Sequence, residues 1–171
     1  MLAPAPDRGV DPAAASSSAT SGRGGPNINL STGLSTDYLN HFTEALMMLE
    51  MAGTMPECLD DLRAWELKTY PEHFAASHFS NRDAIIAAYQ SADPAVRMAL
   101  DEASDVLNTM VRRTRELVFR HIGTAEVEAI VRRALDKLRP LIARTAALIN
   151  GTAFEPDRQG PQAAVDAIFD R

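Results

Sequence analysis

The chain has 171 residues, of which 46% are hydrophobic and 23% are charged, a balance typical of one soluble globular domain. No stretch approaches the roughly 20 uninterrupted apolar residues that a bilayer-spanning helix needs, so the sequence predicts no contact with a membrane interior. Cys58 is the only cysteine, which excludes an intrachain disulfide, and the opening MLAPAPDRGV does not resemble a secretory signal. We therefore expect a cytoplasmic protein.

The formal net charge of −6 hides two sections of opposite sign. Residues 37–105 carry 13 acidic and 4 basic side chains, whereas residues 106–150 carry 9 basic and 4 acidic ones. The simplest interpretation is that the two sections neutralise each other, within one molecule or across a dimer. Nucleic-acid binding is disfavoured, because helical periodicity scatters the arginines around their helices instead of gathering them on one face.

The first 34 residues are rich in Ala, Ser, Gly and Pro and contain few large apolar groups. Such a composition cannot bury enough surface to offset the entropy lost on ordering, so residues 1–34 are expected to form a disordered tail. Ile28, Leu30 and Leu34, at the end of this tail, have the character to pack against the folded part. The helical domain is expected over residues 35–150.

Helix start and stop signals are clear from Ser35 onward. A first helix is predicted over residues 37–52 and ends at Gly53. Two similar motifs follow, TMPE at residues 54–57 and TYPE at residues 69–72. In each, the threonine can cap a helix, the glutamate can reach back to it, and proline occupies the first turn. They predict short helices near 56–67 and 71–78, and a further one ends near residue 92.

Two long amphipathic helices are predicted next. Apolar residues recur every three or four positions from Val96 to His121 and again from Val127 to Leu148, with a Gly-Thr turn between the two stripes. They predict an antiparallel helical hairpin with arms of about 40 Å at ~1.5 Å rise per residue. The expected fold class is therefore all-α: a bundle built on this hairpin, one further long helix and several short helices.

The last 21 residues, 151–171, read as a linker and a short amphipathic C-terminal helix. Ile168 and Phe169 fall on the apolar side of this helix. The helix either docks on its own domain or binds a partner.

Methionines are concentrated around the first predicted helix. Leu39, Phe42 and Leu46 share the core face, whereas Met47 and Met51 fall on the opposite side. Three interpretations stay open: packing in irregular gaps, a groove that binds a protein, and a copper site with thioether ligands. The residues that we favour for a partner-binding surface are Met47, Met51, Met55, Trp65, Ile168 and Phe169.

The histidines form no recognised metal motif. Two-metal carboxylate bundles use Glu-x-x-His pairs, and the chain has only the reversed order, His41 with Glu44. His73 and His78 are five residues apart and would point away from each other on one helix. A metal- or small-ligand-binding bundle, with an oxidoreductase as one form, is the alternative hypothesis. Its candidate ligands are His41, Glu44, His73, His78 and His121.

Catalytic motifs are absent from the sequence. It contains no Gly-rich phosphate loop, no HExxH and no GxSxG, and Cys58 lies among acidic residues that oppose thiolate formation. No catalytic residue and no cofactor is predicted. The favoured hypothesis is a non-catalytic, cytoplasmic adaptor or regulatory protein that binds another protein or a second copy of itself.

Overall fold

The computed structural model describes residues 28–152, and this part of the chain is all-α, with six α-helices and no strand. The predicted fold class is confirmed at that level. The helices are α1 (Leu39–Ala52), α2 (Leu59–Ala64), α3 (Tyr70–Ala76), α4 (Arg82–Ser91), α5 (Pro94–Arg120) and α6 (Glu126–Ile149). Short 3-10 helices precede α1 and α2, at Thr36–Tyr38 and Pro56–Cys58. Within residues 28–152, none of the helices is long and apolar enough to cross a membrane.

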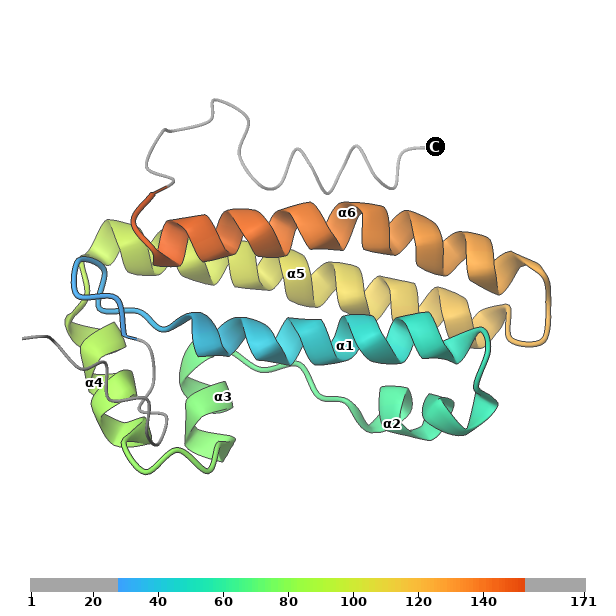
Figure 1. Cartoon of the computed structure of the whole chain (residues 1–171), viewed down its shortest axis with the longest axis horizontal. Coiled ribbons are helices and arrows are strands. Elements are labelled where there is room, and N and C mark those ends of the chain that lie inside the picture. The colour runs from blue at the N-terminus through green and yellow to red at the C-terminus, as the bar shows by residue number, and fades with distance from the viewer. Residues whose placement is uncertain (1–27, 153–171) are drawn as a thin grey trace, which may run out of the picture.

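The three longest helices form the body of the molecule. Figure 1 shows α1, α5 and α6 lying along the longest axis, with α2, α3 and α4 on one side of them, and α1 packs against both α5 and α6. A short turn joins α5 to α6, and Gly123 within it has a φ of 79°, in the left-handed region that suits glycine. The three helices bury the apolar stripes expected of them, and fully buried side chains include Phe42, Leu107 and Leu138.

The two proline motifs behave differently. At residues 69–72 the predicted capping box is present: the Glu72 amide donates to the Thr69 hydroxyl, and the Glu72 carboxylate accepts from the Thr69 amide at 2.8 Å. At residues 54–57 the prediction of a cap is wrong. The Thr54 hydroxyl instead donates back to the Met51 carbonyl at 3.4 Å, and the residue that precedes α2 is Cys58, which makes no side-chain cap hydrogen bond.

The segment before α1 belongs to the folded unit from Ile28 onward, although the sequence places residues 28–34 in a disordered tail. Leu34 is fully buried, and the buried Thr32 hydroxyl donates to the Ile149 carbonyl at 2.5 Å, which ties this segment to the end of α6. Leu30, by contrast, is fully exposed. Residues 1–27 and 153–171 lie outside the described residues, and with them the predicted C-terminal helix.

We expect Thr32→Val to lower the free energy of unfolding by about 1–3 kcal/mol, because the Ile149 carbonyl would lose the hydrogen bond from the buried hydroxyl. Urea unfolding followed by circular dichroism measures this change. Thr54→Val is the matched control, because the Thr54 hydroxyl is exposed and its bond to Met51 is long, at 3.4 Å. Equal effects of the two substitutions would contradict the prediction.

Candidate functional site

The oppositely charged sections of the chain meet between α1 and α6. Glu50 of α1 forms an ion pair with Arg139 of α6. Arg115 of α5, in the basic section, also donates to the backbone carbonyl of Trp65 at 2.6 Å. This bond holds the acidic section, residues 37–105, against α5. Other ion pairs, such as Arg132 with Glu128 at 3.0 Å, stay within one section.

The methionines predicted for a partner lie on α1, at Met47 and Met51, and in the turn that follows it, at Met55. The Met47 side chain is 54% exposed, Met55 is 39% exposed, and Met51 between them is half-buried. We refer to Met47, Met51 and Met55 as the methionine face. Met48 belongs to the core instead, where it packs against the buried apolar residues.

Trp65, also predicted for the partner surface, is buried with only 8% of its side chain exposed. Its indole stacks on the His41 ring, with centroids 4.4 Å apart and an interplanar angle of 19°. The assignment of Trp65 to an exposed surface is therefore corrected: it is a core residue. Ile168 and Phe169 lie outside the described residues.

The structure brings together three of the five residues proposed as ligands. His41 and Glu44 from α1 and His73 from α3 line one cavity of about 410 Å³, which we call the histidine pocket. His78 is exposed and does not line it. His121 lies at the far end of α5, where its Nδ1 is 2.6 Å from Glu126 Oε2. The residues that line the histidine pocket are Asn40, His41, Glu44, Lys68, His73, Ala76 and Ser77.

His41 is the most buried polar residue of this pocket, with 5% of its side chain exposed. Its ring stacks on the Trp65 indole, and the centroid of the His73 ring is 5.6 Å away. Its Nε2 has no hydrogen-bond partner in the described part of the chain, and neither has the Trp65 Nε1. Burial first, and then the charges of His73 and Lys68, lower the pKa of His41 to about 4. The ring is therefore neutral at pH 7.

His73 is half-buried and also favours its neutral form. Burial is the main cause of its lowered pKa and Lys68 adds to it, whereas Asp37 opposes the shift through its charge and a backbone hydrogen bond. The Thr69 capping box fixes the first turn of α3 and so the position of His73. Within residues 28–152, no group of three or more His, Cys, Asp or Glu side chains is placed to hold a metal ion.

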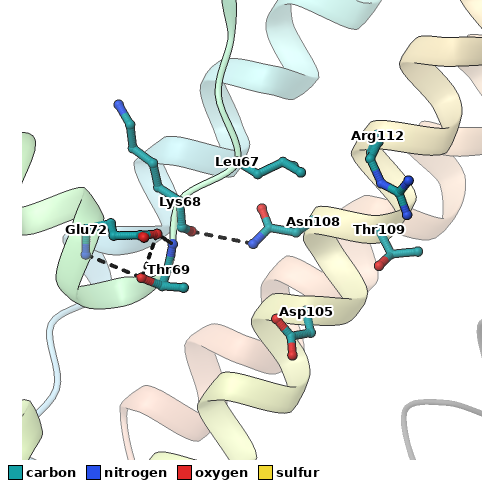
Figure 2. A pocket seen from close by; sticks show the side chains of 8 residues that line it. All are labelled: Leu67, Lys68, Thr69, Glu72, Asp105, Asn108, Thr109 and Arg112. Carbon is teal, nitrogen blue, oxygen red and sulfur yellow. Dashed lines mark hydrogen bonds between the residues drawn. The ribbon is translucent and has the colours of Figure 1, made fainter.

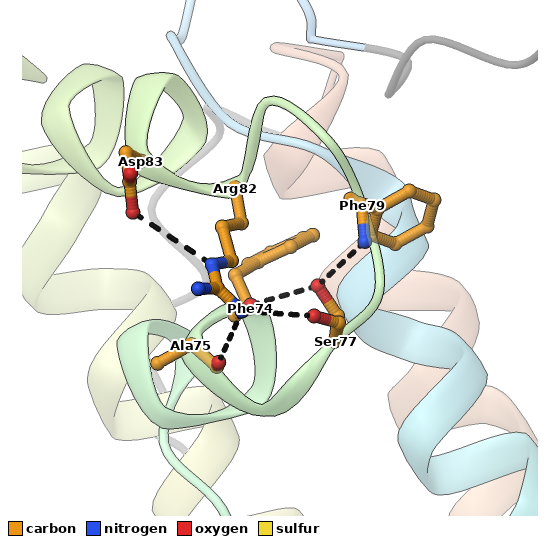
Figure 3. Close-up of polar contacts among 6 residues, drawn as sticks. All are labelled: Phe74, Ala75, Ser77, Phe79, Arg82 and Asp83. Atoms are coloured by element: carbon orange, nitrogen blue, oxygen red, sulfur yellow. Dashed lines mark hydrogen bonds and ion pairs between the residues drawn. The ribbon is translucent and has the colours of Figure 1, made fainter.

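The far end of α3, where Ala76 and Ser77 line the pocket, is held by polar contacts with the next loop (Figure 3). The Ser77 hydroxyl donates to the Phe74 carbonyl at 2.7 Å. Arg82, at the start of α4, donates to the carbonyls of Ala75 and Ser77 at 3.4 and 3.5 Å. These bonds satisfy carbonyls that the end of a helix leaves without partners, and they fix this wall of the pocket.

A second groove, of about 440 Å³, lies on α5 beside the extended residues 66–69 (Figure 2). Lys68 lines both cavities, and its carbonyl accepts from Tyr38 at 2.9 Å and from Asn108 at 3.5 Å. The Asn108 Oδ1 is buried without a partner among the described residues. No motif in the sequence marks Lys68 or Asn108 for a site, although Asp105, Asn108 and Arg112 recur at helical spacing on one side of α5.

Comparison with protein-family models, with curated proteins and with solved structures finds no match to this chain. The function is therefore inferred from the residues and their geometry.

Proposed function

We propose that this chain is a non-catalytic, cytoplasmic adaptor or regulatory protein that binds another protein through the methionine face. The observation that carries the proposal is the exposure of Met47, at 54%, on a helix whose opposite side is buried in the core. Methionine side chains are flexible and polarizable, so a face built from them can adapt to apolar side chains of a partner.

The charges around the methionine face suit a basic partner. Helix α1 contains no lysine or arginine, and the exposed carboxylates of Glu44 and Glu57 lie before Met47 and after Met55 in the chain. A partner with the complementary chemistry is an amphipathic helix whose apolar side is bordered by Lys or Arg. A second copy of this chain is the other occupant that the test must distinguish.

The framework that we propose for this surface is a bundle built on an antiparallel hairpin of α5 and α6, against which α1 packs. The apolar contacts of α1 with both helices support this arrangement, because they hold its buried side while leaving the methionine face outside. The lone cysteine, Cys58, is buried and free, as suits a reducing compartment.

We expect Met47→Glu combined with Met55→Glu to weaken binding of a labelled amphipathic Leu/Lys helical peptide by at least about tenfold. The reason is that each buried methionine contributes roughly 1.5–3 kcal/mol and 1.4 kcal/mol corresponds to tenfold in affinity. Fluorescence anisotropy measures the affinity, circular dichroism checks helicity, and sedimentation velocity tests for a second copy. The added carboxylates attract the basic peptide, so a loss of binding cannot be explained by net charge.

The matched control for this experiment is Met98→Glu. Met98 is 60% exposed and lies at the start of α5, away from the methionine face. It should leave the affinity unchanged or raise it slightly. Equal weakening by Met98→Glu, or no weakening by the double substitution, would overturn the proposal.

A second candidate function, small-ligand binding, is favoured by one observation in the histidine pocket. The chain brings His41 and His73 together across 32 residues of sequence, and it leaves the buried Nε2 of His41 without a partner. Buried polar atoms without partners are costly, so they mark places where a ligand atom adds stability.

A further inference from the structure

Two opposite charges line the histidine pocket. Lys68 lies on the extended segment before α3, and Glu44 lies on α1. Neither side chain forms an ion pair with another residue in the part of the chain that the structure describes. Both charges are therefore available to a molecule that enters the pocket.

The two charges have different surroundings. Lys68 is half-buried and lies close enough to His41 and His73 to lower the pKa of both rings. Because the rings stay neutral, the ammonium of Lys68 is the positive charge of this part of the pocket, and an anionic group is attracted to it. The Glu44 side chain is exposed at the rim and attracts a cationic group.

His41 supplies a third recognition element. A neutral imidazole has one N–H donor and one lone-pair acceptor, and the Nε2 of His41 is buried without a partner among the described residues, so a hydrogen bond to a ligand needs a small rotation of the ring that brings this atom to the pocket surface. Leaving such an atom buried and unpaired costs about 1–3 kcal/mol, which a correctly placed ligand atom would recover. The histidine pocket has a volume of about 410 Å³ and is open to solvent, so a ligand enters it without a change in the fold.

The geometry points to the histidine pocket as a binding site for a small zwitterion that carries a carboxylate and an ammonium group, the chemistry of a free amino acid. The ligand carboxylate binds Lys68, the ligand ammonium binds Glu44, and His41 makes a further hydrogen bond. A molecule with a single charge satisfies only one of the two charged side chains. This inference rests on the second candidate function, small-ligand binding.

The test is a titration of the full chain with each standard amino acid, followed by NMR of the His41 and His73 ring protons. Acetate and methylammonium, which carry one charge each, are titrated in parallel. We expect saturable shifts with at least one amino acid, at an affinity about tenfold or more above that of either single-charge ion, since charge-assisted hydrogen bonds contribute roughly 1.5–3 kcal/mol each. The bound carboxylate should also raise the pKa of His41, because it offsets the charge of Lys68.

Lys68→Met and Glu44→Gln should each weaken this binding by about tenfold. Their matched controls are Lys137→Met on α6 and Glu102→Gln on α5, which lie outside the pocket and should bind as the unmodified protein does. All four side chains are exposed or half-buried, so the variants should keep their helicity by circular dichroism.

The outcomes separate the inference from the function on which it rests. If acetate or methylammonium binds as tightly as every amino acid, the proposal that the ligand is a zwitterion is overturned. Small-ligand binding at this pocket would then still stand. The absence of saturable shifts with all three kinds of probe would overturn both. Equal weakening by the pocket variants and by their controls would also overturn the assignment of this site.

Discussion

Replacement of Trp65 by alanine is expected to lower the free energy of unfolding by about 3–5 kcal/mol, the usual cost of deleting a large buried aromatic side chain. Only 8% of Trp65 is exposed, and its indole covers the ring of His41 with centroids 4.4 Å apart. The truncation would leave a cavity between α1 and the start of the extended segment. Denaturant unfolding followed by circular dichroism measures the loss.

Trp65→Phe is the informative companion of this substitution. Phenylalanine keeps an aromatic ring against His41 but removes the indole N–H, which is buried without a partner in the described residues. The smaller ring lowers the free energy of unfolding, whereas removal of a buried polar atom without a partner raises it. We therefore expect a net loss below about 1.5 kcal/mol. An alanine variant as stable as the phenylalanine variant would show that Trp65 lies on the surface, as the sequence suggested.

The local features of the fold could be predicted because their causes are local. The stripe of Leu39, Phe42 and Leu46 fixes the buried side of α1 by its spacing alone, and these residues are buried. The cap at Thr69 was also predictable, since all its atoms lie within four residues. The similar motif at Thr54 failed because the Thr54 hydroxyl donates back to the Met51 carbonyl of α1 and α2 begins only at Leu59, which depends on where the preceding helix ends.

The site could be predicted only in part, because its residues converge from three segments. The sequence spacing paired His41 with Glu44 on one helix but could not show that Trp65 and His73 lie against its ring. The sequence grouped His78 and His121 with them as candidate ligands, and the structure leaves both outside the pocket. Lys68 was missed because an extended segment has no period from which the direction of a side chain can be read.

Acidification should destabilise this protein through the histidine pocket. The pKa of His41 falls from the ordinary 6.5 to about 4 in the folded state, mainly because the ring is buried. Above pH 6.5 the ring is neutral in both the folded and the unfolded chain, so it contributes no pH dependence. Between pH 6.5 and pH 4 the unfolded chain binds a proton that the folded chain excludes, so stability falls as the pH falls.

The expected size of this loss is about 3 kcal/mol from His41 alone by pH 4, at 1.36 kcal/mol per pH unit. His73 acts in the same direction, because its pKa is also lowered by burial and by Lys68. Urea unfolding at a series of pH values measures the loss. Glu72 adds a separate loss at lower pH, since hydrogen bonds from Thr69 hold its pKa below the ordinary value.

His41→Phe separates these contributions. Phenylalanine keeps an apolar ring in the stack with Trp65 but cannot bind a proton, so the variant should lose about 3 kcal/mol less than the unmodified protein between pH 6.5 and pH 4. The loss from Glu72 is present in both proteins and cancels in the difference. His78→Gln should retain the full acid sensitivity, because His78 is exposed and outside the pocket. Parallel stability curves for the unmodified protein and His41→Phe would show that His41 is protonated as readily in the folded chain as in the unfolded one, and that the ring is open to water.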